Sequence, residues 1–442
     1  MLSFIQKNVR SGLLSLLAVM TLHHAAAMGI DDVISVDDVV DGGNNFNWQR
    51  IELPGTYCSD GSQYKFWVHD SALSTNLVVL YEGGGACWDY ATCSGQTGKL
   101  GAANPNGIAN DYINKTKARF VSPIVNGEDP GLPLIRDKNA IATKGWDVAY
   151  MPYCTGDVHI GNNVVTYVDD SGVSPPFNFF HTGYNNSTKA LDFLASHFPN
   201  INKMLITGFS AGGVASTAIY QEARERLQPK QGFMLNDSGP LFPAPNGNFN
   251  SKLMHKKVIQ AWRLSSIRGA FPDDFRFWNL GKMVGAMARK YPNDKFAYTG
   301  FSRDYNFSRF SYELFYPSAS KADILRMWRE DQNNLIAEMK KYPNYSYFVP
   351  WKRQINDSHC SSILTFMGAR VCPTIRLRKW YERINFNPTQ KWICDKSFTP
   401  MNGFLNAWLN RSVTVRMVEP FNKYNEQDAT MRLVSPLING AL

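Results

Sequence analysis

The sequence of 442 residues lacks the features that divide a chain into separate parts. It has no Ser/Gly/Pro-rich linker, no block of like charge and no internal repeat. After residue 27, no stretch approaches the roughly 20 consecutive apolar residues that a membrane span needs. The sequence therefore predicts a single domain over residues 28–442, with no membrane span in the mature chain.

The first 27 residues have the pattern of a secretion signal. Lys7 and Arg10 precede an apolar run over residues 13–22, and Ala25-x-Ala27 offers a cleavage site flanked by small residues. This order of charge, apolar run and small residues is typical of signal peptides. We therefore expect residues 1–27 to be a cleavable signal peptide and the protein to be secreted or periplasmic.

The seven cysteines include no Cys-x-x-Cys pair, which argues against a thiolate metal site. In an exported protein they indicate disulfides, because export leads to an oxidising compartment. Cys87 and Cys93 are close enough in sequence to close a small loop, and Cys360, Cys372 and Cys394 cluster near the C-terminus. The odd number leaves at least one thiol free or in an intermolecular bond.

The formal net charge of +9 does not indicate nucleic-acid binding. The Lys and Arg residues are spread along the chain rather than arranged as a stripe on one helix, and export also argues against such a partner. Two interpretations stay open: an anionic polysaccharide or cell surface as partner, or a basic protein with no electrostatic partner.

The segment around Ser210 is the strongest functional signal. The apolar residues 204–207 are typical of a buried strand, and Gly208-x-Ser210-x-Gly212 follows them directly. Residues 214–227 then have apolar positions at helical spacing. A serine between a buried strand and a helix is the arrangement of a nucleophile elbow, in which the amide of the next residue, here Ala211, faces an oxyanion.

A second glycine-rich turn complements this serine. The apolar run over residues 76–81 leads through Glu82 into Gly83, Gly84 and Gly85. In a serine hydrolase, the amides of Gly84 and Gly85 would join that of Ala211 as donors to the oxyanion.

Further strand patterns occur at residues 64–69, 146–153, 231–237, 295–301 and 345–350, and residues 320–342 form an amphipathic helical pattern. Long irregular loops are expected at residues 104–114 and 169–186. Together these patterns predict an α/β fold with a buried sheet, flanking helices and loop insertions.

The order of catalytic residues in α/β-hydrolases, which is serine, acid, histidine, leaves His255 and His359 as candidates for the base. His255 is next to two lysines, Lys256 and Lys257, in a helical pattern, so we expect it to be a solvated surface residue. His359 follows a predicted strand in a loop, which favours it as the base. Two acids stay open as its partner: Asp304, after the second-to-last strand, and Asp237, after the strand next to Ser210.

Asp157-x-His159 could be read as two ligands of a metal, but no third ligand lies nearby in the sequence. We therefore expect this segment to be a loop that lines a pocket. Trp88 and Asp237 are further candidates for the substrate pocket.

The chain resembles the pectin acetylesterase/Notum family of serine carboxylesterases in motifs that cover most of residues 58–394. The matching segments are Tyr81-Glu82-Gly83-Gly84-Gly85-Ala86-Cys87-Trp88, Tyr153-Cys154-Thr155-Gly156-Asp157-Val158-His159-Ile160-Gly161, Gly208-Phe209-Ser210-Ala211-Gly212-Gly213, Asn236-Asp237-Ser238-Gly239 and His359-Cys360.

The resemblance implies an α/β-hydrolase-like fold with a mostly parallel central sheet flanked by helices, and a Ser, Asp, His triad without metal or cofactor. Matched to the motifs, Ser210 is the nucleophile, His359 the base, and Gly84, Gly85 and Ala211 the oxyanion donors. Tyr298-Thr299 and Arg309-Phe310 resemble the segment that bears the acid, which places Asp304 there. The family often has Trp where Gly85 or Ala86 stands, so the acyl pocket is expected to differ in shape.

These observations predict an exported carboxylic-ester hydrolase. The resemblance implies a short acyl group, such as acetyl, on a polysaccharide such as pectin. Two alternatives stay open: a lipid or long-acyl ester as substrate, and a catalytically silent glycan-binding protein on the same scaffold.

Overall fold

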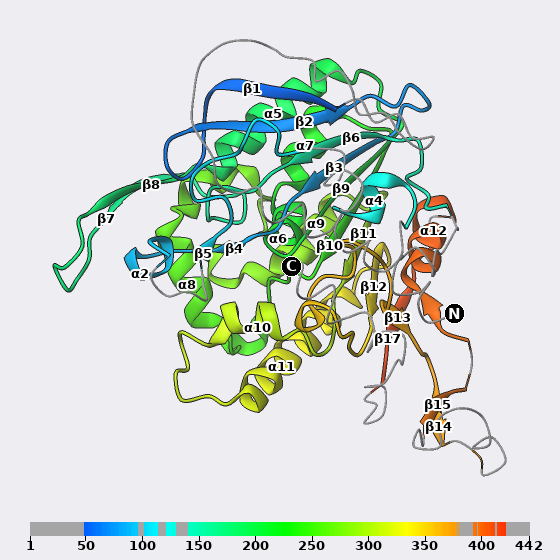
Figure 1. The fold of residues 1–442 in the computed structure, drawn as a ribbon. Helices are drawn as coiled ribbons and strands as arrows, with labels where there is room; N and C mark the ends of the chain where they lie inside the picture. Colours follow the sequence, from blue (N-terminus) through cyan, green and yellow to red (C-terminus); the bar gives the residue numbers. More distant parts are fainter. Residues whose placement is uncertain are drawn as a thin grey trace, which may run out of the picture.

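A nine-stranded sheet spans the molecule, with the first described strand at one edge and the last described strand at the other (Figure 1). The computed structural model describes residues 48–95, 101–113, 121–129, 140–377, 379, 392–395, 397–411 and 413–420. The predicted signal peptide lies outside these residues. In spatial order the strands are β1 (Trp48–Tyr57), β2 (Gln63–His69), β6 (Asp147–Met151), β3 (Leu77–Tyr81), β9 (Lys203–Phe209), β10 (Gln231–Asp237), β11 (Lys295–Thr299), β12 (Tyr345–Val349) and β17 (Arg416–Val418).

The sheet is parallel from β6 to β17, and β1 and β2 add an antiparallel edge. Every residue of β3, β6 and β12 is buried, as expected for parallel strands covered on both faces. In parallel sheets the carboxyl ends of the strands share one edge, where ligand sites form. The segments that follow β3, β9, β10, β11 and β12 therefore meet at this edge.

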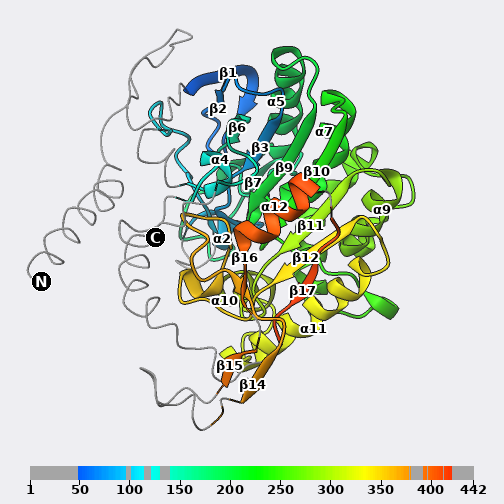
Figure 2. The ribbon, with the colours of Figure 1, turned by 90° about the vertical axis from the view of Figure 1, so that its right-hand side faces the viewer.

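Helices cover both faces of the sheet, as expected for an α/β fold. Phe233 of β10 packs on Trp408 of α12 (Met401–Arg411), which lies on one face (Figure 2). The neighbouring residue Met234 points to the opposite face, where its sulfur accepts hydrogen bonds from Ser216 and Thr217 of α6 (Ala211–Ala218). The other long helices are α5 (Gly183–His197), α7 (Tyr220–Leu227), α8 (Lys252–Ala261), α9 (Met283–Lys290), α10 (Tyr305–Tyr312) and α11 (Lys321–Met339).

Short elements complete the described fold. They are the strand pairs β4 (Gly85–Ala86) with β5 (Gly101–Ala102), β7 (Asn163–Tyr167) with β8 (Phe177–His181), β13 (Arg370–Val371) with β16 (Thr399–Pro400) and β14 (Ile375–Leu377) with β15 (Trp392–Cys394); the helices α2 (Tyr90–Cys93) and α4 (Pro123–Asn126); and the 3₁₀ helices η1 (Pro245–Gly247), η2 (Leu264–Ala270), η3 (Phe277–Lys282) and η4 (Asn356–Ser358).

Two predicted boundaries are wrong. The expected loop over residues 169–186 contains strand β8 and the start of α5. The expected helix over residues 214–227 is two helices that meet at Ile219, and the first begins at Ala211. The sequence pattern does not predict this start, because glycine disfavours a helix interior and positions 212 and 213 are both glycine. At Gly212 the missing side chain is a packing requirement, since a Cβ there would lie 1.9 Å from the Tyr81 carbonyl oxygen.

Disulfides join Cys58 to Cys154, Cys87 to Cys93 and Cys372 to Cys394. The predicted small loop between Cys87 and Cys93 is confirmed, and Cys360 is buried with a free thiol. Three disulfides fit an exported protein. In the part of the chain that the structure describes, no helix has the length and apolar character needed to cross a bilayer.

His255 is buried, so the prediction of a solvated surface residue is wrong. Only 3 % of it is exposed, and its ring packs on Phe249 at 5.0 Å between centroids. Neither ring nitrogen has a hydrogen-bond partner in the described structure. Burial lowers its pKa to about 3. The adjacent Lys256 suggested a surface position, but helix α8 turns residue 255 inward together with Met254 and Val258.

We expect the substitution His255→Leu to raise the free energy of unfolding by about 1–3 kcal/mol at pH 5, because it removes two unpaired buried nitrogens. The pKa of His255 is about 6.5 in the unfolded chain and lower in the folded protein. The free energy of unfolding of the wild type therefore falls as the pH drops below about 6.5. The gain should therefore be smaller at pH 8. Urea denaturation at both pH values measures it, and an equal gain or a loss at pH 5 would contradict this account.

Candidate active site

Ser210 lies in a sharp turn between β9 and α6. Its φ of 58° and ψ of −121° are costly for a residue with a side chain, and such conformations cluster at functional sites. The Ser210 amide donates a hydrogen bond to the Asp237 carbonyl at 2.8 Å. A Cβ on Gly208 would lie 2.3 Å from the Gly212 carbonyl oxygen, so both flanking positions require glycine. This is the strand–turn–helix geometry that the sequence predicts.

The glycine loop, which consists of Gly83, Gly84 and Gly85 after β3, packs against the Ser210 turn. A Cβ on Gly83 would lie 2.8 Å from the Ser210 Cβ. Gly85 and Ala211 line the same cavity as Ser210. Gly84 is next to them in the loop, and its carbonyl accepts a hydrogen bond from the Ala103 amide at 2.7 Å. The three predicted oxyanion donors thus belong to segments that meet at the serine.

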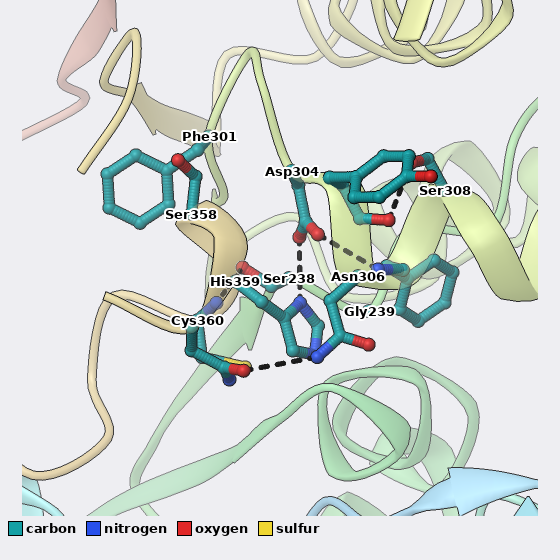
Figure 3. Close-up of polar contacts among 12 residues, drawn as sticks. Ser238, Gly239, Phe301, Asp304, Asn306, Ser308, Ser358, His359 and Cys360 are labelled. Atoms are coloured by element: carbon teal, nitrogen blue, oxygen red, sulfur yellow. Dashed lines mark hydrogen bonds and ion pairs between the residues drawn. The ribbon is translucent and has the colours of Figure 1, made fainter. Parts of the chain in front are cut away.

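His359 pairs with Asp304. The distance from His359 Nδ1 to Asp304 Oδ2 is 2.8 Å, and both side chains are buried (Figure 3). Asp304 caps α10, where Oδ1 accepts a hydrogen bond from the Phe307 amide at 2.9 Å. Burial raises the pKa of Asp304, and His359 opposes this shift. A carboxylate accepts hydrogen bonds, so with Asp304 ionised Nδ1 is the donor of this pair, and Nε2 is the ring nitrogen left to act as a base.

Asp237, the second acid that the sequence leaves open, has a different set of partners. Its carboxylate accepts hydrogen bonds from the amides of Ser361 (2.9 Å) and Ser362 (2.7 Å) and from their hydroxyl groups. These residues follow His359 in the same loop. Asp237 therefore fixes the histidine loop through its side chain and the Ser210 turn through its carbonyl.

Arg353 was missed by sequence reasoning. It is buried beneath the histidine loop, and its guanidinium donates hydrogen bonds to the carbonyls of Cys360 and Thr365. Burial lowers its pKa to about 10, while the nearby Asp237 carboxylate opposes this shift. No sequence pattern indicates this role, because an arginine beside Lys352 in a loop has the pattern of a surface cation.

A cavity of about 700 Å³, counted with its open mouth, adjoins Ser210. Trp88 lines it, as the sequence suggests. Almost every lining side chain is apolar, and the residues are Gly85, Ala86, Trp88, Val158, Ile160, Ser210, Ala211, Val214, Pro240, Leu241, Met254, Val258, Trp262, Leu264, Phe271, Phe277, Leu280, Met283, Phe307 and Phe310.

Asp157 and His159 lie behind the cavity wall, and only Val158 and Ile160 of this loop face the cavity. Asp157 accepts hydrogen bonds from Thr155 Oγ1 at 2.5 Å and from the Gly183 amide at 2.8 Å. Burial raises the pKa of Asp157 to about 7 and lowers that of His159 to about 4.

One group of described side chains, Cys87, Cys93 and His181, is close enough to hold a metal ion. The two sulfurs form a disulfide, however. The His181 nitrogens bond to the Thr155 carbonyl and the Tyr167 hydroxyl. None of the three is available as a ligand in this state.

The substitution Asp237→Asn should lower the free energy of unfolding by about 3 kcal/mol, because an amide NH₂ would face buried N–H donors of the histidine loop. Asp273→Asn is a matched control, since Asp273 is exposed. Urea denaturation measures both. If Asp237→Asn is as stable as the control, the carboxylate does not hold the loop.

No family model matches this chain, and no curated protein matches it significantly.

Proposed function

We propose that this protein is a serine carboxylic-ester hydrolase that acts on esters with a long apolar acyl group. The observation that carries the proposal is the position of Ser210, which lies in a strained strand–helix turn and lines an apolar cavity. The His359–Asp304 pair lies at the same edge of the sheet.

In the proposed reaction, Ser210 Oγ attacks the ester carbonyl while His359 Nε2 takes the hydroxyl proton. Asp304 holds the Nδ1–H of the same ring and stabilises the imidazolium that forms. The tetrahedral oxyanion accepts hydrogen bonds from the amides of Gly84, Gly85 and Ala211.

His359 then returns its proton to the leaving alcohol as the C–O bond breaks, which leaves an acyl group on Ser210. Water then attacks the acyl carbonyl while His359 takes its proton; as the bond between the acyl carbon and Ser210 Oγ breaks, His359 returns this proton to Oγ, and the carboxylic acid leaves. The proton transfers in these steps involve only the hydroxyl proton of Ser210 and the protons of water.

The cavity supports the long-acyl alternative rather than the acetyl ester that the family resemblance implies. Burial of a methylene group stabilises a complex by about 0.8 kcal/mol, so an apolar lining beside Ser210 favours a chain of such groups. An acetyl group would leave most of the apolar lining unused. The three disulfides are consistent with action outside the cell.

The first test compares the wild type with Ser210→Ala and Asp304→Asn on p-nitrophenyl esters. Loss of the nucleophile should reduce kcat by about a million-fold. Loss of the acid should reduce it by about 10,000-fold, because the imidazole would no longer be held in the right tautomer. If wild type and Ser210→Ala hydrolyse these esters equally slowly, the protein is a silent binding protein rather than an enzyme.

The second test is the chain-length profile of the wild type. From acetate to decanoate, kcat/KM should rise about fourfold per methylene until the cavity is filled. A profile that is highest for acetate would support the short-acyl alternative instead.

Val258→Phe places extra volume in the cavity and should reduce kcat/KM for the decanoate by about tenfold or more, while the acetate value stays within about twofold. Leu253→Phe, on the exposed side of the same helix, is the control that should change neither.

A further inference from the structure

The loop that carries Asp157 and His159 is fully buried but takes no part in the proposed chemistry. His159 Nε2 lies 2.8 Å from the carbonyl oxygen of Glu82. A carbonyl oxygen only accepts hydrogen bonds, so Nε2 carries the proton. Burial lowers the His159 pKa to about 4, and the ring is therefore neutral at physiological pH.

This hydrogen bond fixes the peptide that leads into the oxyanion loop. The Glu82 amide donates to the Met151 carbonyl at 2.9 Å, and the Glu82 carbonyl accepts from His159, so both sides of the residue are held. The next residue is Gly83, which lies against the Ser210 turn. Because a trans peptide is planar, the direction of the Glu82 carbonyl also sets the direction of the Gly83 amide.

His159 is itself held rigidly. Its amide donates to Asp157 Oδ1 at 3.1 Å and its carbonyl accepts from Ser187 Oγ at 3.2 Å. The ring packs between Tyr81 and Tyr153, at 5.0 and 4.7 Å between centroids.

The backbone of this turn is strained, because φ is positive at both Val158 (51°) and His159 (64°). A positive φ at two adjacent non-glycine residues costs conformational free energy, which the surrounding hydrogen bonds and packing must offset. Such strain clusters at functional sites. This strained turn places the imidazole within hydrogen-bond distance of the Glu82 carbonyl.

We propose that His159 is a positioning residue for the oxyanion hole: it fixes the Glu82–Gly83 peptide, the anchor from which the loop continues to the oxyanion donors Gly84 and Gly85. The inference rests on the proposed hydrolase function. Its effect should be confined to the transition state, because the oxyanion exists only there.

The test compares His159→Gln with His159→Met in the full chain, with a long-chain p-nitrophenyl ester as substrate. Both side chains are unbranched and similar in size, but only Gln carries an N–H donor that reaches the Glu82 carbonyl. We expect the Met variant to lose about 10–100-fold in kcat with KM changed by less than about threefold. The affinity of the Met variant for an alkyl trifluoromethyl ketone, which forms an oxyanion on the serine, should fall in parallel. The Gln variant should keep most of the wild-type kcat and most of the wild-type ketone affinity.

His159→Asn provides a second comparison if the Met variant does not fold. Asn tolerates a positive φ but is one methylene shorter than Gln, so it should fold and still show the low kcat. Equal kcat and equal ketone affinity in the donor and non-donor variants would overturn the inference while leaving the hydrolase proposal intact. If the wild type hydrolyses no ester and forms no adduct with the ketone, the proposed function itself fails.

Discussion

Asp237 connects the two halves of the candidate site. Its carbonyl holds the amide of Ser210, and its carboxylate holds the amides of Ser361 and Ser362 next to His359. This arrangement is possible because β9 and β10 are parallel and in register, with Phe209 opposite Asp237. One buried residue thus fixes a serine turn through its carbonyl and a histidine loop through its carboxylate, and these two segments are about 150 residues apart in the sequence.

Close backbone packing imposes a second constraint on the same edge of the sheet. Helix α6 begins directly at Ala211 and touches the end of β3, which only glycine at position 212 permits. The glycine loop after β3 lies equally close to Ser210 through Gly83. The positions of the nucleophile and of the oxyanion donors therefore depend on one another.

Much of the sheet and part of the site could be predicted from the sequence. Buried parallel strands are continuous apolar runs, so β3, β9 and β10 were found close to their observed bounds. The chain order of strands also limited the partner of His359 to Asp304 or Asp237. It could not decide between them, because that choice depends on which acid the loop geometry brings to Nδ1.

Other features depend on contacts that are distant in sequence. His255 and Arg353 have the local patterns of surface residues, yet tertiary packing buries both. The apolar cavity is built from segments between residues 85 and 310, and no single segment indicates its size. The positioning role that we propose for His159 rests on its bond to the Glu82 carbonyl, which joins residues 77 positions apart in the sequence.

The most direct test of the central claim is a crystal structure of the protein after reaction with a long-chain alkyl fluorophosphonate. The account predicts a single covalent bond from phosphorus to Ser210 Oγ, a phosphoryl oxygen facing the amides of Gly84, Gly85 and Ala211, and the alkyl chain inside the apolar cavity. An adduct on another residue, no adduct, or an alkyl chain directed into solvent would contradict it.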